Sequence, residues 1–295
     1  MTGPVPRWVA AGAPGWPERL AHLNEPPAGI WLWGAEPPLP PAVAIVGSRR
    51  ATVTGLAIAR GLGRDLAEAG VQVISGMARG IDSAAHRGAL EGGGTTVAVL
   101  GCGIEVCYPP EAARLRDDIL ARGCLISEEP PEAPPVPFNF PKRNRLIAAL
   151  ALAVVVVEAT VRSGALSTAR WAADLGRDVL AVPGSILSSR SDGTNRLIRD
   201  GARPLLGVDD LFEAVPELGG RPAAGASPKR NRRRVPRLSP ELEALLRHLG
   251  PEPIHPDSLG AATGLPAASV ASSLGALELA GAVMSLPGGL VSRTF

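Results

Sequence analysis

The amino-acid sequence predicts an α/β protein with an extended, mostly parallel β-sheet that carries helices on both faces. Two observations support this fold class. Apolar runs such as Ala42–Val46 and Val154–Val157 contain no polar residue, as is typical of strands buried on both faces. Segments with helical spacing of apolar residues alternate with these runs, which favours parallel strands joined by crossover helices. The strand, glycine turn and helix that begin at Ala42 make the expected sheet Rossmann-like.

The expected elements follow one another from residue 42 onwards. In the first half we expect, in chain order, a strand and turn in Ala42–Thr52, a helix from Thr52 to about Glu68, a strand and turn in Val71–Asp82, a helix to about Leu90, a strand in Thr95–Gly103, a helix in Glu111–Ala121 and a strand in Cys124–Glu128. In the second half we expect a strand in Ala153–Ala159, a helix in Gly164–Leu175, a strand in Asp178–Gly184 and a short helix after Asn195. A ligand crevice is then expected beyond the carboxyl ends of the strands.

Composition divides the chain into four expected parts. Residues 1–41 are rich in Pro and Trp, and we expect a short helix and a strand there, packed on the core as an N-terminal extension. Residues 42–215 form the expected Rossmann-like domain. Residues 216–237 contain Gly, Pro and a basic run, which is typical of a flexible linker. That run either adds a non-specific attraction for DNA or is a solvated tether.

Residues 238–295 are expected to form a small winged-helix domain. Helix starts at Ser239-Pro240 and near Pro256 are followed by a third helix, Pro266–Ala280, and by a hairpin turn through Gly288-Gly289. The third helix contains no Lys or Arg, whereas a helix that reads duplex DNA needs basic or amide side chains. We therefore expect this domain to be a protein-interaction or regulatory module.

Length, charge and cysteine content exclude several classes of protein. The chain has 295 residues and a net charge of only +2, so any surface for nucleic acid must be local. Three cysteines with irregular spacing predict neither a zinc site nor a disulfide framework. No apolar run reaches the roughly 18 residues of a membrane span, and no signal peptide is evident. We expect a cytoplasmic protein without metal or cofactor.

Candidate catalytic groups are few. The sequence lacks a Walker motif, and the glycines Gly101 and Gly103 follow the third expected strand rather than the first. His86 is expected to pack or hydrogen-bond on a helix. Glu158 either serves as a base or holds neighbouring backbone N–H groups, and Asp82 is a candidate helix-capping anion. Without a paired nucleophile and base, we expect a binding protein rather than an enzyme.

A basic stretch, Phe138–Leu150, carries the strongest binding signal. Lys142, Arg143 and Arg145 precede an apolar run with helical spacing, which predicts a cationic loop entering a buried helix. The N-terminus of a helix is already positive, so cations placed there indicate that a ligand supplies negative charge. We expect that ligand to be the phosphate backbone of single-stranded DNA.

Eight motifs, in order and spacing, resemble the DprA/Smf DNA-processing family. They are IVGSR (Ile45–Arg49), SGMARGID (Ser75–Asp82), AVLGCGIEVCYP (Ala98–Pro109), FPKRNRLIA (Phe140–Ala148), VVVEA (Val155–Ala159), RSGAL (Arg162–Leu166), AVPG (Ala181–Gly184) and GTNRLIRDGA (Gly193–Ala202). The resemblance implies an extended Rossmann domain that dimerises, binds single-stranded DNA and helps to load RecA during natural transformation. It also implies no enzymatic activity. Many members carry an N-terminal helical domain, which we expect to be absent here.

The same resemblance implies a set of residues that contact the strand. They are Gly47, Ser48 and Arg49 on the first loop, Gly76, Arg79 and Gly80 on the second, and Phe140, Lys142, Arg143, Asn144 and Arg145 on the basic stretch. Alternatives remain for three of them. Lys142 is also a candidate partner of Glu129, Arg145 of Glu158, and Phe140 either packs in the core or stacks on a base.

Two other functions are compatible with the sequence. A nucleotide phosphoribohydrolase of a related Rossmann group would carry a motif with paired glycines and an acid, and the nearest run, Arg162–Thr168, lacks both. A scaffold that binds a small regulatory nucleotide would also use glycine loops.

Overall fold

The computed structural model describes residues 5–35, 41–219, 239–250, 253–279, 282–286 and 288–293. The chain divides into two compact units, Met1–Ala223 and Ala224–Phe295. The basic run 229–237, expected to be a linker, lies outside the described residues. The expected linker begins with Pro216–Leu218, which forms a 3-10 helix whose Leu218 is buried.

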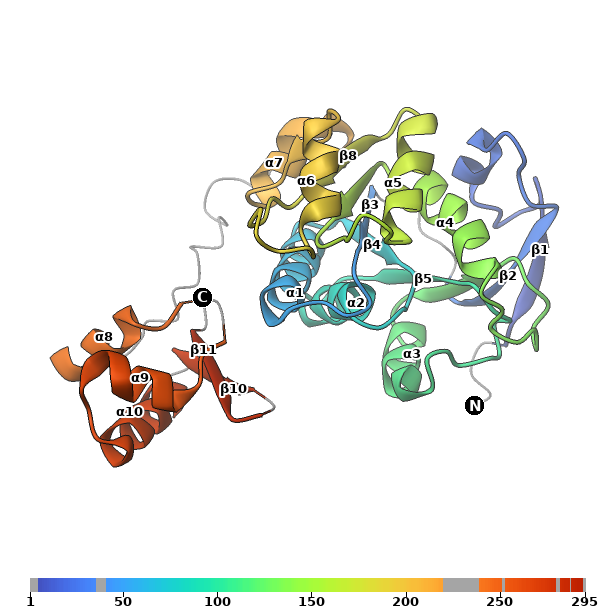
Figure 1. The fold of residues 1–295 in the computed structure, drawn as a ribbon. Helices are drawn as coiled ribbons and strands as arrows, with labels where there is room; N and C mark the ends of the chain where they lie inside the picture. The colour runs from blue at the N-terminus through green and yellow to red at the C-terminus, as the bar shows by residue number, and fades with distance from the viewer. Residues whose placement is uncertain are drawn as a thin grey trace. The chain divides into compact units, whose positions relative to one another are not determined.

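Nine strands of the first unit form one sheet in the order β1-β2-β6-β5-β4-β3-β7-β8-β9 (Figure 1). The strands are β1 (Arg7–Ala10), β2 (Gly29–Gly34), β3 (Ala42–Val46), β4 (Gln72–Ser75), β5 (Thr96–Leu100), β6 (Cys124–Ser127), β7 (Ala153–Val156), β8 (Asp178–Ala181) and β9 (Arg203–Pro204). From β6 to β9 all neighbouring strands are parallel, and β2 joins β6 in an antiparallel pair. The mostly parallel, Rossmann-like sheet predicted from the sequence is confirmed.

The two faces of this sheet are buried under different helices. Along β3, Val43 and Ile45 face one core, whereas Ala44 and Val46 face the other, because successive side chains of a strand alternate. The first core is covered by α1 (Val53–Glu68), α2 (Ile81–Glu91) and α7 (Val208–Ala214). The second is covered by α4 (Asn139–Leu150) and α5 (Ala165–Asp174). This double coverage explains why the central strands β3 and β7 contain only apolar residues.

The first unit contains two further helices and two further 3-10 turns. Short 3-10 turns occur at Glu18–His22 and Pro110–Ala112, and the helices are α3 (Ala113–Leu120) and α6 (Asp192–Arg199). The N-terminal segment differs from expectation, since it contributes two strands, and its helix is the 3-10 turn at Glu18–His22. Trp8 of β1 packs on Trp31 of β2 with ring centroids 5.5 Å apart, which joins this pair at the edge of the sheet.

The strand order reverses between β3 and β7. The chain runs outward from β3 through β4 and β5 to β6, and then crosses back to place β7 on the other side of β3. The chain continues from β3 toward β4 and from β7 toward β8, which lie on opposite sides of this point. The two connections therefore leave in opposite directions, and a crevice opens between them at the carboxyl edge. The fold thus places the turn after Val46 beside the turn after Val156.

The basic stretch is helical rather than a loop. Helix α4 begins at Asn139, so Lys142, Arg143 and Arg145 lie within its first two turns. The expectation of a cationic loop is therefore wrong. Their charges are balanced by buried and half-buried carboxylates of the protein itself.

His86 is a core residue of α2. Its ring is fully buried, and Nδ1 lies 2.7 Å from Thr96 Oγ1, which in turn donates to Val73 O. Burial lowers the pKa of His86 to about 3, so the imidazole is neutral at physiological pH. The sequence-based expectation that His86 packs or hydrogen-bonds on a helix is confirmed.

The second unit is a winged-helix domain with its own core. Its elements are α8 (Pro240–Arg247), α9 (Pro256–Thr263), α10 (Ala267–Leu279), β10 (Val283–Leu286) and β11 (Leu290–Arg293). Leu245, Leu259 and Leu277 are buried in a cluster made of all three helices and the hairpin. The exposed side of α10 carries Ala, Ser and Gly together with Glu278, whose carboxylate accepts from the Ser285 N–H.

We therefore expect the fragment 238–295 to show no binding of duplex DNA at micromolar concentration and physiological salt, because α10 offers no cation to phosphates or bases. Fluorescence anisotropy with a labelled duplex measures this, and circular dichroism checks that the fragment is helical. Micromolar binding by the folded fragment would contradict the expectation that this unit is an interaction or regulatory module.

Candidate functional site

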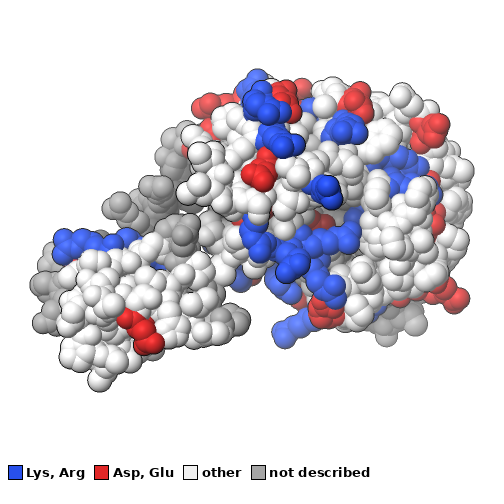
Figure 2. Space-filling model, in the orientation of Figure 1, with Lys and Arg blue, Asp and Glu red and all other residues white. Residues whose placement is uncertain are grey.

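The main hollow of the first unit lies at the point where the strand order reverses. It has a volume of about 760 Å³, and its walls come from the turn after β3, the first turns of α4 and the start of α5. The lining residues include Val46, Gly47, Ser48, Arg49, Arg50, Asp82, Tyr108, Phe140, Arg143, Asn144, Thr160, Ser163, Gly164, Thr168 and Arg190. Figure 2 shows Lys and Arg side chains gathered around the centre of this face of the first unit.

The turn after β3 is held in place by Glu158. Its carboxylate accepts from the N–H of Thr52, 3.0 Å away, and from the Thr52 hydroxyl, while that hydroxyl accepts from Gly55 N–H at 2.9 Å and caps α1. A Cβ on Gly47 would lie 2.7 Å from Ile81 Cγ1, so only glycine allows this turn to lie so close to α2. Glu158 holds backbone groups, as one of its two sequence interpretations predicted.

The second loop, Gly76–Gly80, is held by two buried charges. Asp82 accepts from the N–H of Gly76 at 3.2 Å and of Ala78 at 3.4 Å. Arg143 Nη1 donates to Gly76 O at 3.0 Å and also to Val99 O. A Cβ on Gly76 would lie 2.6 Å from the Arg143 guanidinium, so this glycine makes room for the cation. Gly76 is thus bound from both sides, through its N–H and its carbonyl.

Arg143 is mainly a structural residue, because it is buried and donates to backbone carbonyls. Its side chain is only 5% exposed. Burial lowers its pKa to about 10, while the nearby Asp82 opposes the shift, so Arg143 keeps its charge at neutral pH. The pKa of Asp82 is raised by burial, against the influence of Arg143. Arg143 borders the hollow and gives it positive charge, but its hydrogen bonds go to the protein.

An aromatic pair and an arginine form one side of the hollow. The rings of Tyr108 and Phe140 lie 5.4 Å apart at 49°, and the guanidinium carbon of Arg49 lies 5.0 Å from the centre of the Phe140 ring. Phe140 therefore borders the hollow, whereas Phe138 is 75% exposed. One part of the Phe140 ring is covered by a cation, at a distance typical of a cation–π contact.

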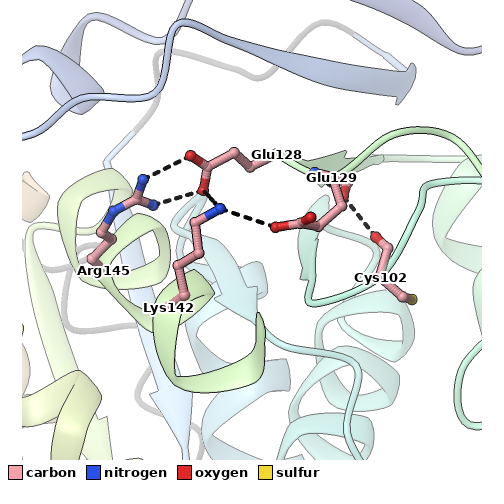
Figure 3. Close-up of polar contacts among 6 residues, drawn as sticks. Cys102, Glu128, Glu129, Lys142 and Arg145 are labelled. Carbon is pink, nitrogen blue, oxygen red and sulfur yellow. Dashed lines mark hydrogen bonds and ion pairs between the residues drawn. The ribbon is translucent and has the colours of Figure 1, made fainter. Parts of the chain in front are cut away.

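Lys142 and Arg145 do not line the hollow, and both are paired with acids (Figure 3). Lys142 Nζ lies 3.1 Å from Glu129 and 3.5 Å from Glu128. Arg145 donates to both oxygens of Glu128, at 2.8 and 3.0 Å. The expected Lys142–Glu129 pair is confirmed, but the expected Arg145–Glu158 pair is wrong, because Glu128 at the end of β6 lies closer to α4.

Lys142 and Arg145 differ in their exposure to solvent. Lys142 remains 38% exposed, while Arg145 is 12% exposed. Lys142 is therefore accessible to an anion that replaces its carboxylate partners, and Arg145 acts as part of the packing.

Arg79 and Gly80 line a second hollow of about 310 Å³, which shares Arg49 and Arg50 with the main one. Arg79 forms an ion pair with Glu111, and both side chains are more than half exposed. Gly80 has a φ of 79°, and a Cβ there would collide with Ser48 O.

The structure brings six of the expected residues to the main hollow: Gly47, Ser48, Arg49, Phe140, Arg143 and Asn144. Gly76 lies behind them.

Several lining residues were not predicted from the sequence. Arg50 and Arg190 add two cations, and the Arg190 guanidinium donates to Arg50 O across the rim. Tyr108 adds the second ring, and Thr160–Thr168 adds hydroxyl groups. The RSGAL motif at Arg162–Leu166 was the one signal for the last group, since it matched the family without an assigned role.

Catalytic and metal-binding groups are scarce around the hollow. Asp82 is the one carboxylate among the described lining residues, and it is buried and already accepts two backbone N–H groups. Across the described part of the chain, no three His, Cys, Asp or Glu side chains come together as metal ligands.

No helix within the described residues is long and apolar enough to cross a membrane.

Replacing Arg143 with Met is expected to destabilise the first unit by about 3–5 kcal/mol, because Asp82 is then left buried without a counter-charge. The double variant Arg143→Met/Asp82→Asn should lose less than the sum of the single changes. Urea unfolding followed by tryptophan fluorescence measures this, since all five tryptophans lie in the first unit. Exposed Arg170→Met is the control, with a change of about 0.5 kcal/mol or less. Additive single changes would contradict the coupling.

Replacing Glu129 with Gln is expected to raise the affinity of this surface for a polyanion, for which a labelled oligonucleotide is the probe, about threefold, because Lys142 then lacks its nearest acid. The gain should shrink as salt rises. Glu132→Gln removes an equal charge from an exposed neighbour and serves as the control. Fluorescence anisotropy at two salt concentrations measures both variants, and an equal gain in both would mean that only net charge matters.

Comparisons with known proteins agree with this geometry. Residues 7–216 match the family model of DNA recombination-mediator protein A, and residues 228–289 match the DprA winged helix domain. A putative DNA processing protein DprA of Mycobacterium tuberculosis is 41% identical over 89% of this chain and 68% of its own length. Protein Smf of Escherichia coli is 37% identical over 96% of this chain and 76% of its own.

Two solved structures are also similar. DNA processing protein A from Streptococcus pneumoniae has a TM-score of 0.68 and 38% identity, over 71% of this chain and 74% of that one. The Helicobacter pylori protein, whose structure is described in terms of its single-stranded DNA binding mode, has a TM-score of 0.63 and 28% identity, over 70% of this chain and 94% of that one. With the family model covering residues 7–216, the chain belongs to the DNA recombination-mediator protein A family of DNA-processing proteins.

Proposed function

We propose that this protein binds single-stranded DNA in the main hollow and acts as a recombination mediator. The observation that carries the proposal is the charge of the hollow. Four arginines, Arg49, Arg50, Arg143 and Arg190, line it against the single carboxylate of Asp82, which is already engaged. A surplus of fixed cations in a recess suits the phosphate backbone of a nucleic acid.

The shape and the aromatic groups favour a single strand over a duplex. A recess of about 760 Å³ between two turns accommodates part of a flexible strand, whereas a duplex keeps its bases stacked inside and its phosphates on a wide cylinder. Tyr108 and Phe140 offer ring surface to one unstacked base. Because Asn144, the one amide side chain of the described lining, already donates to Gly164 O and Ser167 Oγ, binding should depend little on sequence.

Family membership supports a role beyond binding. The family is described as a recombination mediator, and the Helicobacter pylori relative is described by its single-stranded DNA binding. We extend this to protection of incoming single strands and loading of RecA during natural transformation, with the first unit forming a cytoplasmic homodimer. These finer roles rest on the resemblance to the DprA/Smf proteins. The engaged state of Asp82 supports a binding site without catalysis.

Replacing Arg49 with Glu is expected to weaken binding of single-stranded DNA at least tenfold for every base composition, because Arg49 lines both hollows and also contacts the Phe140 ring. The slope of log K against log salt should become shallower by about 0.7 for each phosphate that the variant no longer neutralises. Mobility shift or anisotropy, with single- and double-stranded oligonucleotides of equal length at two salt concentrations, measures both effects.

Arg199→Glu is the matched control, because Arg199 is 71% exposed on α6 and is paired with Asp200 outside both hollows. It should change affinity by less than about twofold. Tighter binding of duplex than of single strands by the natural protein would contradict the proposed ligand, and equal affinity of both variants would contradict the proposed site.

A further inference from the structure

The wall of the main hollow formed by the start of α5 has unused hydrogen-bond donors. It is built from the turn after β7, and Thr160, Ser163, Gly164 and Thr168 line it. Arg49, Arg50 and Arg190 contribute to the same hollow from other elements. The α5 wall is therefore uncharged, whereas the rest of the lining carries the cations.

Thr168 presents its hydroxyl to the hollow. It is 1% exposed and lines the hollow, and its Oγ1 makes no hydrogen bond to any described residue. Other buried hydroxyls of this unit are satisfied: Thr96 donates to Val73 O, and Ser75 donates to Ile45 O. The Thr168 hydroxyl lies on the wall of the hollow without a partner among the described residues, so it can donate to a ligand that enters the hollow.

The usual partner of a helical threonine is already occupied. Thr168 would donate to the carbonyl four residues earlier, Gly164 O. That oxygen accepts from Asn144 Nδ2 at 3.2 Å, from Ser167 Oγ at 2.8 Å and from Ser167 N–H at 3.1 Å. Asn144 also donates to Ser167 Oγ at 2.8 Å, so it acts as a positioning residue for the start of α5. The Thr168 hydroxyl therefore remains available to donate to a ligand in the hollow.

Gly164 offers a second free donor. Its backbone N–H has no acceptor among the described residues. Its φ is −61°, which any residue adopts, and a Cβ built there meets no heavy atom within 4 Å. Neither backbone conformation nor packing requires glycine at this position. The absence of a Cβ does leave the N–H open to close approach by a ligand atom.

These donors suit an anion. Helix α5 has ten residues, and the N–H groups at its start give that end a partial positive charge. Ser163 Oγ already accepts from Ala165 N–H at 3.3 Å, so its hydroxyl hydrogen also remains available. The only carboxylate in the described lining, Asp82, is held by Gly76 and Ala78 and does not compete.

We infer that the start of α5 is a second phosphate subsite, in which Gly164 N–H and the Thr168 hydroxyl donate to one phosphate of the bound strand while Arg49 and Arg50 hold a neighbouring phosphate. The inference deepens the proposed function and rests on it. The two subsites differ in kind, because one supplies charge and the other supplies neutral donors. The salt dependence of the affinity therefore distinguishes the loss of one subsite from the loss of the other.

The test compares Thr168→Val with Thr168→Ser in the full chain, using a labelled oligothymidylate of about 30 nucleotides and anisotropy at several salt concentrations. Thr168→Val keeps the shape and removes the hydroxyl, and it should lower affinity about fivefold to tenfold. The salt slope should stay unchanged, since the variant keeps every charge, whereas Arg49→Glu makes that slope shallower. Thr168→Ser should keep affinity within about twofold of the natural protein, because the donor is retained.

Gly164→Ala provides a second, independent variant. It should leave the thermal unfolding temperature unchanged and lower affinity at least threefold, because the added Cβ obstructs the N–H. Gly61→Ala in α1, where a Cβ also meets nothing within 4 Å, is its control and should bind normally. If Arg49→Glu weakens binding while Thr168→Val and Gly164→Ala bind like the natural protein, the subsite is wrong and the proposed function stands. If the natural protein binds no single strand, the proposed function itself is wrong.

Discussion

The buried guanidinium of Arg143 is the constraint on which the carboxyl edge of the sheet depends. A charge in the protein interior is tolerated only with a counter-charge and with hydrogen bonds to its donors. Asp82 supplies the counter-charge, and the carbonyls of Gly76 and Val99 accept the hydrogen bonds. Because Asp82 also accepts from the N–H of Gly76, Asp82 and Arg143 together hold the second loop through both the N–H and the carbonyl of this residue. That loop in turn lies against the turn after β3, where Ile81 N–H donates to Ser48 O at 3.2 Å.

This arrangement separates cations that hold the fold from cations that face a ligand. Arg143 and Arg145 on α4 are largely buried and paired within the protein, and Lys142 is paired but accessible. Arg49 and Arg50 instead come from the turn after β3, where no described carboxylate lies within ion-pair distance of them. A basic cluster on a helix that packs against the sheet must satisfy its charges internally, since burial removes the water that would otherwise solvate them. Turns at the edge of the sheet have no such requirement.

The sequence was most informative where a single type of residue, apolar in a buried strand or glycine in a tight turn, indicates where a segment lies in the fold. The wholly apolar strands β3 and β7 indicated a sheet covered on both faces, and the glycine turn after β3 identified the edge that carries the hollow. The Lys142–Glu129 pair could be predicted, but the partners of Arg143 and Arg145 could not, because Asp82 and Glu128 reach α4 only through the crossovers of the sheet. Tyr108 and Arg190 escaped prediction for the same reason, and β1 was missed because four residues give too little periodicity.

The contact between Arg49 and Phe140 links the two kinds of binding expected in the hollow. A guanidinium over an aromatic ring is worth roughly 0.5–1 kcal/mol near solvent, which is less than its charge-assisted hydrogen bond to a phosphate. In the proposed complex, a base that stacked on the covered part of Phe140 would displace Arg49 and free it to meet the backbone of the same strand. A phosphate that drew Arg49 away would uncover the ring for a base. Each event would favour the other without reading a base edge, so the coupling would strengthen binding to any sequence.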